Sequence, residues 1–237
     1  RPVLGGNDSS EIRMWICGAQ GDDNTETGLL EEIQLENYYR NSEMVYTVWD
    51  TVLYEKVKFE KNITLLLNTT CNDVTKDGNR ISSIKGWQLT NQTWHDVSAK
   101  MFIDCSGDSV LRICGARFRW GREARGEFNE SHAPVEADKK TMGNSILIQL
   151  REIDPKDHVP FVPPAWAHKY KETDLPNRHL MPKGNPDNFW WMEVGGLDDT
   201  IGDSEEIRDE LYKIAFGVWD LIKNHPDGRA RKWTLEW

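Results

Sequence analysis

Hydrophobic residues recur at helical spacing in two segments near the start of the chain. The first predicted helix begins near Thr27 and is ended by Asn41 and Ser42. The second begins near Thr47, where Thr47-x-x-Asp50 resembles a capping box. The apolar positions of the two helices are Leu29, Leu30, Ile33 and Tyr38, followed by Trp49, Val52, Leu53 and Val57. Residues 1–24, which precede them, are predicted to form a long loop.

Short β-forming runs separated by turn residues predict an antiparallel meander in the middle of the first half. The turns are marked by Asp77-Gly78 and by Asn91-Gln92. The predicted strands cover residues 63–67, 69–75, 80–90, 94–97 and 99–104. We expect the last of these strands to be buried and to lead through a turn into a short apolar helix over 110–114.

The second half combines two predicted strands, a proline-rich loop and one strongly amphipathic helix. The strands cover 143–151 and 189–194, and the segment 154–187 between them holds seven prolines. We expect Phe161 and Trp166 to anchor this segment. The helix covers 204–224, with Asp203-x-x-Glu206 as its predicted cap and with apolar residues at intervals of four and three. The whole pattern predicts an α/β fold, with domains over 1–115 and 116–237.

Composition and charge exclude several classes of protein. The 237 residues include 11 Trp, 7 Phe and 6 Tyr, whereas disordered chains are poor in aromatic residues. The net charge of -10 argues against nucleic-acid binding and against a polybasic membrane-surface protein. No apolar stretch reaches the ~20 residues of a membrane span. The four cysteines form no CxxC pair, so we expect buried thiols and no metal site.

Three stretches carry residues suited to binding or chemistry. In residues 4–10 (LGGNDSS), paired glycines allow backbone N–H groups to approach an anion or a flat ring closely, although most such pairs are only turns. In 102–109 (FIDCSGDS), a strand ends in small polar residues before a helix, which is either a ligand site or an ordinary turn. In 120–125 (WGREAR), arginines beside Trp120 suit carboxylate or sugar recognition, or form a solvated charged face.

The order of these motifs resembles the FAD-dependent oxidoreductases of the glutathione-reductase-like class. The similarity is greatest to a bacterial group found among polysaccharide-utilisation genes and sometimes labelled xanthan lyase. It is carried by residues 1–19 and 104–125, and it extends over nearly the whole chain. The resemblance implies a partial FAD-binding, Rossmann-like domain that includes the meander, followed by part of a mixed-sheet substrate domain.

The resemblance also implies which residues bind FAD. The matching positions are Arg1, Gly5, Gly6, Asn7, Ser9, Ser10, Cys71, Ser106, Gly107 and Asp108. The strand around Cys71 would offer its backbone to the adenine, and 106–108 (SGD) matches a motif that often reads Thr-Gly-Asp. The family's G-x-G-x-x-G loop is expected about 30 residues before Arg1, so the sequence resembles the middle of a larger flavoenzyme.

The implied activity is oxidation of a small or carbohydrate-derived substrate, with hydride transfer to the flavin. Arg122 and Arg125 are candidates for anchoring an acidic or sugar-like substrate, and Glu123 is a candidate base. Two alternatives stay open: a module that binds or cleaves carbohydrate, and an inactive fragment that assembles with a partner chain. The resemblance leaves a homo-oligomer open as well.

Overall fold

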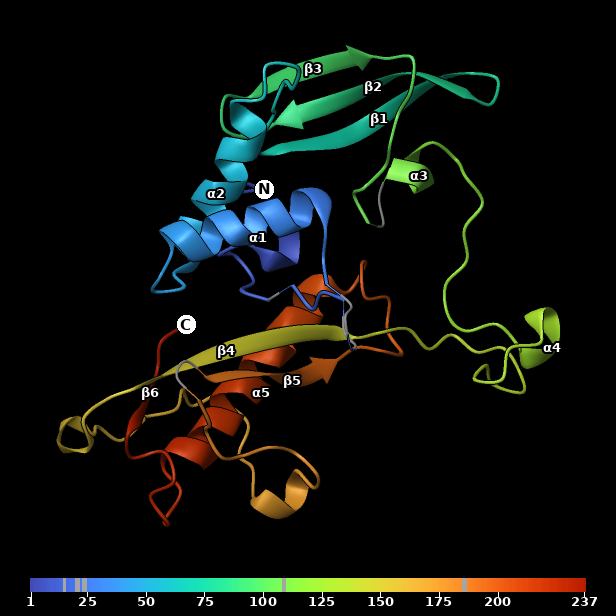
Figure 1. Ribbon diagram of the computed structural model, residues 1–237. Coiled ribbons are helices and arrows are strands. Elements are labelled where there is room, and N and C mark those ends of the chain that lie inside the picture. Colours follow the sequence, from blue (N-terminus) through green and yellow to red (C-terminus); the bar gives the residue numbers. More distant parts are fainter. Residues whose placement is uncertain (15, 20–21, 23–24, 108–109, 185–186) are drawn as a thin grey trace. The chain divides into compact units, whose positions relative to one another are not determined.

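The computed structural model describes residues 1–14, 16–19, 22, 25–107, 110–184 and 187–237. The chain divides into two compact units, Arg1–Phe118 and Arg119–Trp237. Each unit combines helices with one three-stranded antiparallel sheet, as Figure 1 shows. The predicted α/β class is therefore confirmed.

The first unit contains the N-terminal loop, two helices, the meander and a short third helix. Its elements are η1 (Gly6–Asp8), α1 (Gly28–Arg40), α2 (Tyr46–Lys58), β1 (Thr69–Asp77), β2 (Arg80–Gln88), β3 (Thr93–Ser98) and α3 (Val110–Ile113). The strands lie in the order β1-β2-β3, each antiparallel to its neighbour, so the predicted meander is confirmed. Gly78 makes the first tight turn, with the left-handed φ of 58° that glycine adopts without strain.

Helices α1 and α2 lie against each other and are joined by two ion pairs. Arg40 of α1 contacts Glu55 of α2 at 2.7 Å, and Lys56 of α2 pairs with Glu32 of α1. Within α1, Arg40 also contacts Glu36 at 2.6 Å. The buried face of α2 includes Trp49 and Val52, as predicted, whereas α1 has no fully buried residue. Most of the apolar packing described in this unit therefore comes from α2.

The predicted start of α2 near Thr47 is confirmed to within one residue, but the capping box predicted at Thr47 does not form. The side-chain oxygen of Asn41 accepts a hydrogen bond from the Val45 backbone N–H at 2.8 Å. The helix begins directly after Val45, so Thr47 lies inside its first turn and caps nothing. The Asp50 carboxylate, expected in the capping box, instead contacts the N-terminal loop.

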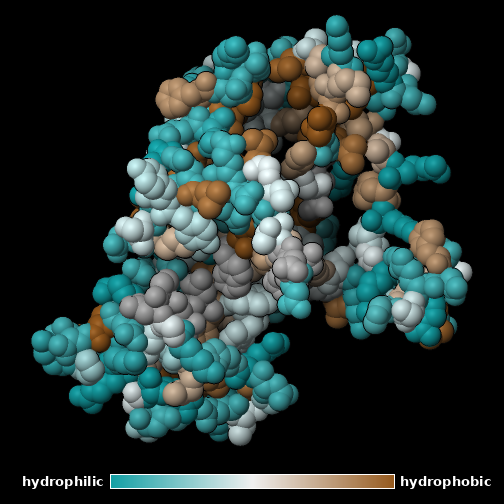
Figure 2. Space-filling model, viewed as in Figure 1, coloured by the Kyte–Doolittle hydropathy of each residue, from teal (hydrophilic) through white to brown (hydrophobic). Residues whose placement is uncertain are grey.

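Two of the predicted strands do not form. Residues 63–67 and 99–104 pair with no other strand among the described residues, and a β run without a partner cannot satisfy its backbone groups in a ladder. The second run, predicted to be buried, is instead open to solvent: Met101 is 80% exposed and Ile103 is 88% exposed. Apolar side chains at the surface are visible in Figure 2.

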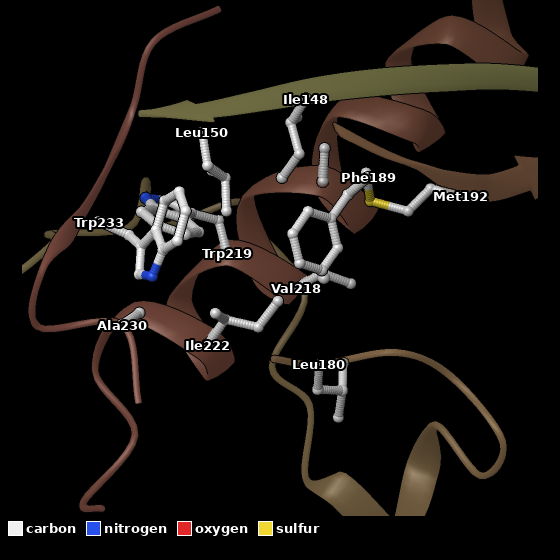
Figure 3. Close-up of a cluster of buried hydrophobic side chains, with 11 residues drawn as sticks. Ile148, Leu150, Leu180, Phe189, Met192, Val218, Trp219, Ile222, Ala230 and Trp233 are labelled. Atoms are coloured by element: carbon white, nitrogen blue, oxygen red, sulfur yellow. The ribbon is translucent and has the colours of Figure 1, made fainter. Parts of the chain in front are cut away.

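The second unit packs one long helix against its sheet. Its elements are α4 (Arg125–Phe128), β4 (Asn144–Glu152), η2 (Pro155–Asp157), η3 (Glu172–Asp174), β5 (Asp187–Val194), α5 (Ser204–Lys223) and β6 (Trp233–Leu235). The sheet order is β5-β4-β6. Figure 3 shows Trp219 and Val218 of α5 packed with Leu150 of β4, Phe189 of β5 and Trp233 of β6. Burial of these side chains provides the main apolar stabilisation of the unit.

The expected mixed sheet and the expected cap of α5 differ from what the structure shows. Every strand pairing in the described residues is antiparallel, which is compatible with the partial FAD-binding domain but gives no mixed sheet there. Asp203 does occupy the N-cap position of α5, but its side chain makes no capping bond to the helix. It instead accepts a hydrogen bond from the Asp199 backbone N–H at 3.3 Å.

The proline-rich segment 154–187 lies along α5, as its aromatic anchors predict. Phe161 stacks on Phe216 with ring centroids 6.1 Å apart, and Trp166 meets the same ring edge-on at 5.4 Å. The Asn224 side chain accepts from the Phe161 N–H at 3.0 Å and donates to its carbonyl at 2.7 Å. The segment is thus held by both apolar and backbone contacts.

Candidate functional site

The glycine-rich loop over residues 5–10 has a tightly defined conformation. Gly5 and Gly6 have left-handed φ angles of 104° and 60°. A β-carbon at Gly5 would lie 2.9 Å from Leu53 Cδ1, so the loop approaches α2 too closely for a side chain there. Ser9 is fully buried, and its hydroxyl donates to the Gly6 carbonyl at 2.7 Å and accepts from the Glu11 N–H at 3.3 Å.

Two neighbouring residues of α2 fasten this loop. The Asp50 carboxylate accepts a hydrogen bond from the Ser10 backbone N–H at 2.9 Å. Trp49 donates its indole N–H to the Asp8 carboxylate, also at 2.9 Å. Both α2 residues are buried, which strengthens hydrogen bonds by excluding water. The loop is therefore held in one shape by the helix, before any ligand binds.

Three consecutive backbone amides of the loop remain available. Among the described residues, the N–H groups of Gly5, Gly6 and Asn7 donate no hydrogen bond. A β-carbon built on Gly6 would have nothing within 4 Å, so the space beside it is open. Successive amides in a left-handed turn form a concavity that binds anions. The open space and the available amides fit a loop that lies along FAD, which is what the sequence resemblance implies for these residues.

Asp8 is a functional candidate that the sequence reasoning did not single out. Burial raises the pKa of its carboxyl to about 6, with a smaller contribution from the nearby Asp50 and an opposing one from the Trp49 hydrogen bond. A carboxyl group that titrates near neutral pH inside a ligand loop can take up or release a proton during function. The sequence signal that could have identified it is an acidic residue directly after the paired glycines and Asn7.

Arg1 links the loop to the meander. Its guanidinium donates to the Gly6 carbonyl at 3.3 Å and contacts Glu11 at 3.2 Å. Its backbone carbonyl accepts from the N–H of Asn68, the residue just before β1, at 2.9 Å. Arg1 therefore belongs to the same cluster as the predicted residues of the loop.

The turn between 104 and 107 is organised by Asp104, another residue that was not predicted. Its carboxylate accepts hydrogen bonds from the Ser106 N–H at 2.9 Å, the Ser106 hydroxyl at 2.6 Å and the Leu111 N–H at 3.1 Å. These bonds lower the pKa of Asp104 and cap α3. Gly107 has φ 86° and open space beside it. The predicted Asp108 lies outside the described residues.

Cys71 lies at the edge of the meander, close to the Asp104 turn. It pairs with Gly86 of β2 just before a bulge in β1, and β1 is the outer strand of the described sheet. Burial, with contributions from Asp104 and Asp73 against a weaker backbone hydrogen bond, raises the pKa of the thiol. A thiol that stays protonated is a poor nucleophile, so Cys71 is suited to a backbone contact rather than to chemistry.

The predicted substrate residues lie in the second unit, and they differ in how many hydrogen bonds and ion pairs they form with other residues. Arg122 forms a two-pronged ion pair with Asp138, which lowers the pKa of that carboxyl to about 2. The Nε of Arg125 donates to the Ala133 carbonyl at 3.3 Å, but its terminal nitrogens make no hydrogen bond to a described residue. Glu123 is partly exposed and forms no ion pair with a described residue.

Other features of the described residues place limits on the site. They contain no cluster of three or more His, Cys, Asp or Glu side chains arranged to hold a metal ion. No helix within the described ranges has both the length and the apolar character needed to cross a bilayer. A pocket of about 310 Å³ lies beside α1, with Cys17, Glu26 and Leu35 in its wall. None of the predicted site residues lines that pocket.

Comparison with known proteins gives one match. A family model described as "FAD dependent oxidoreductase" matches residues 1–236. No curated protein and no solved structure matches the chain. The match covers almost the entire length, including the loop of residues 5–10, the Asp104 turn and the arginine-rich stretch.

Proposed function

Because the chain belongs to the FAD-dependent oxidoreductase family, we propose that it forms the flavin-contacting and substrate-contacting parts of an enzyme that oxidises a small or carbohydrate-derived molecule. FAD is the cofactor of this family. When bound, it accepts two electrons from a substrate as a hydride. The residues of the chain bind and orient the two molecules.

The observation that carries this proposal is the prepared loop over residues 5–10. Its amides at Gly5, Gly6 and Asn7 have no partner among the described residues, and Asp50 and Trp49 hold it in place. A preformed turn binds a ligand without the entropic cost of ordering a flexible chain. We assign Arg1, Ser9 and Ser10 to the shaping of this turn.

The remaining FAD residues are assigned to the edge of the meander. In the proposal, β1 near Cys71 contributes a backbone contact to the adenine, and the turn at Ser106, Gly107 and Asp108 approaches the flavin. The outer position of β1 in the described sheet supports this, because alternate backbone groups of an edge strand are not used by the sheet. We further propose a glutathione-reductase type of domain for residues 1–115 and a substrate domain for 116–237.

For the substrate, we propose that Arg125 provides the principal anchor. Its terminal nitrogens have no described partner, whereas the guanidinium of Arg122 is already paired with Asp138. In this proposal, Arg122 holds residues 120–125 in position through its ion pair with Asp138. Glu123 is the nearby carboxylate that can accept a proton from the substrate. Trp120 of the same stretch is 63% exposed, and the Lys139 ammonium lies over its ring at 6.0 Å from the centroid.

A pair of matched glycine variants tests the proposal. Gly6 and Gly78 have nearly equal φ angles of 60° and 58°, and both have open space where a side chain would be placed. Gly6→Ala carries the same backbone strain as Gly78→Ala, but it also puts a methyl group beside the proposed flavin site. We expect FAD affinity, measured by fluorescence titration, to fall at least ten-fold in Gly6→Ala only.

If the isolated wild-type chain does not bind FAD, the proposal is contradicted for the chain without a partner. An absorbance spectrum of the purified protein across the flavin bands is the first check. A colourless protein that acquires flavin only with a second chain would favour assembly with a partner. Equal losses of affinity in both glycine variants would show that general strain, rather than contact with the cofactor, is responsible.

A second candidate function, glycan binding, is favoured by an aromatic pair on the meander. Trp87 and Trp94 face each other across β2 and β3, with ring centroids 5.0 Å apart, and Trp94 is 51% exposed. Lys85 lies over the Trp94 ring at 5.4 Å. Binding of an oligosaccharide that is lost in Trp94→Ala and unaffected by FAD would support this alternative.

A further inference from the structure

Strand β5, an outer strand of the second sheet, contains a bulge formed by two adjacent tryptophans. The strand pairs with β4 at Phe189 and at Met192, and between these pairs β5 has two residues where β4 has one. The two are Trp190 and Trp191. The extra residue lets Phe189 and Met192 both point into the core, where each is 1% exposed. Bulges at sheet edges redirect side chains and often lie next to functional sites, so the two tryptophans are candidates for a binding role.

The end of the proline-rich segment places two polar side chains on the aromatic rings of β5. The guanidinium of Arg178 lies over the Trp191 ring, 5.6 Å from its centroid. The ring of His179 stacks on Phe189, with centroids 5.6 Å apart and planes inclined by 12°. Phe189 and Trp191 meet edge-on at 6.3 Å. The four side chains therefore form one contiguous group.

The backbone on either side of the two polar residues fixes their position. Asn177 has a left-handed φ of 64°, and the N–H of Arg178 donates to the Leu175 carbonyl at 3.3 Å, which closes a tight turn. Leu180 follows directly and is one of the buried core side chains labelled in Figure 3. A turn before the pair and a core anchor after it prepare the group, so a ligand need not order a flexible segment.

Two hydrogen-bond donors in this group have no acceptor among the described residues. The indole nitrogen of Trp191 is buried and has no hydrogen-bond partner. Arg178 is exposed, and its guanidinium forms neither an ion pair nor a hydrogen bond with a described residue. Native proteins rarely leave a buried donor without an acceptor, because its lost hydration is not replaced. Since the side chain over the ring is exposed, it can shift to admit an oxygen atom to the indole N–H.

The two donors match a carboxylate group. A guanidinium that stacks on an aromatic ring keeps the N–H groups along its edge, which can form two parallel hydrogen bonds with a carboxylate. The indole N–H supplies a further bond to the same ligand. Arg178 contributes one fixed positive charge, which balances one carboxylate. A phosphate dianion would leave an excess of negative charge in a chain whose net charge is already -10.

We propose that Arg178 and Trp191 form a binding site for a small molecule that bears a carboxylate group. The guanidinium holds the two carboxylate oxygens, and the indole N–H donates to an oxygen of the same ligand. A sugar acid and a simple organic acid share this group, and the test separates these two sources. None of these residues is assigned to the flavin, so the inference goes beyond the proposed function and does not depend on FAD.

The first test measures binding to the wild-type chain in the absence of FAD. Ligand-observed NMR titrations use glucuronate, its neutral methyl ester and acetate. We expect glucuronate to bind at least about ten-fold more tightly than the ester, because the ester lacks the charged acceptor. Similar affinities for acetate and glucuronate would support the site and assign it to simple organic acids. Much weaker binding of acetate would support it and assign it to sugar acids.

Matched substitutions test where the ligand binds. Arg178→Gln should weaken glucuronate binding by about ten-fold or more, because the charged fork is lost. Arg231→Gln is the control, since it removes the same charge from another exposed arginine of this unit. Trp191→Phe keeps an aromatic ring but deletes the N–H, and should weaken binding by about three-fold or more. Trp190→Phe should leave the affinity unchanged. Thermal unfolding checks that each variant is folded.

Three results would overturn the inference. The first is that neither acid binds, or that glucuronate and its ester bind equally, because the carboxylate is then not recognised. The second is an equal loss of affinity in Arg178→Gln and Arg231→Gln, which would show a general effect of charge. The third is an affinity that Arg178→Gln or Trp191→Phe leaves unchanged. Since the assays contain no FAD, each of these results would leave the proposed flavin function intact.

Discussion

The carbonyl oxygen of His168 lies directly against Gly217 of α5. A β-carbon on this glycine would be 2.3 Å from that oxygen and 3.0 Å from the Tyr170 ring. The backbone of the proline-rich segment therefore approaches the helix closely because position 217 has no side chain. A hydrogen bond from the His168 N–H to the Lys213 carbonyl, at 3.1 Å, fixes the same contact.

Gly217→Ala should consequently destabilise the second unit by about 1–3 kcal/mol, because the segment must move away from α5. Gly126→Ala is the matched control, since this glycine is also helical but has nothing within 4 Å of an added β-carbon. The control should be neutral or stabilising by up to about 1 kcal/mol. Urea unfolding of both variants checks the prediction, which fails if the two behave alike.

The hydrogen bond from Ser10 to Asp50 gives a prediction for the loop. Asp50→Ala leaves the Ser10 amide without its acceptor and should cost about 1–3 kcal/mol of stability. Asp96→Ala, at an exposed position of β3, should change stability by less than about 0.5 kcal/mol. Thermal unfolding followed by circular dichroism would compare them, and equal effects would show that Asp50 does not fasten the loop.

The Arg122–Asp138 ion pair predicts a contribution to folding stability that is lost at acidic pH. Because the pKa of Asp138 is lowered to about 2, its stabilising effect is complete above the ordinary value of 3.8 and is lost as the pH falls through about 2. Arg122→Ala should raise the pKa of Asp138 toward 3.8, as measured by NMR titration of the carboxyl carbon. Arg125→Ala should leave this pKa unchanged, so a shift in both variants would contradict the pairing.

Lys223 is a buried ammonium that holds the end of the second unit together. It donates to the carbonyls of Ala230, at 3.2 Å, and Trp233. Lys223→Met keeps the aliphatic stem but removes both bonds, and should destabilise by about 1–3 kcal/mol. Lys232→Met, which removes the surface ion pair with Glu152 and the contact of the ammonium with the Trp233 ring at 5.5 Å, is the control and should cost about 1 kcal/mol.

The same lysine makes a prediction about alkaline pH. Burial lowers the pKa of Lys223 below its ordinary 10.5, so between the two values the unfolded chain binds more protons than the native one. Stability from this group should therefore rise with pH in that window, and the gap between wild type and Lys223→Met should widen. Urea unfolding at pH 8 and pH 10 tests the direction, and a narrowing gap would contradict it.

Local patterns predicted those elements whose signals are complete within the segment itself. The Asp77-Gly78 turn and the flanking β-formers predicted the first hairpin, and the regular apolar spacing of α5 predicted the long helix. Strands that depend on a distant partner could not be predicted in the same way. The run at 99–104 has strand-like composition, yet no described strand pairs with it. In contrast, β6 is only three residues long and was missed, because its pairing with β4 determines it.

The candidate site shows the same division. The glycines and serines of the 5–10 loop were recognisable from their residue types. Asp50 was interpreted as part of a capping box. Its actual hydrogen-bond partner, the Ser10 N–H, is 40 residues away in the sequence, so no local pattern indicates it. Asp8 was passed over because its burial against Trp49 depends on the packing of α2. Long-range contacts, rather than local motifs, determine which polar groups are engaged and which stay available.

The contacts that attach segment 154–187 affect how susceptible the second unit is to proteolysis. Although the segment contains little secondary structure, Asn224 holds it at Phe161, Gly217 accommodates it at His168, and Arg229 pairs with Glu172. Between Phe161 and Glu172, the longest run between two attachments is the six residues 162–167. A protease should therefore cut residues 162–171 only after α5 has released them, so the rate of cleavage there would report how often the helix and this part of the segment separate.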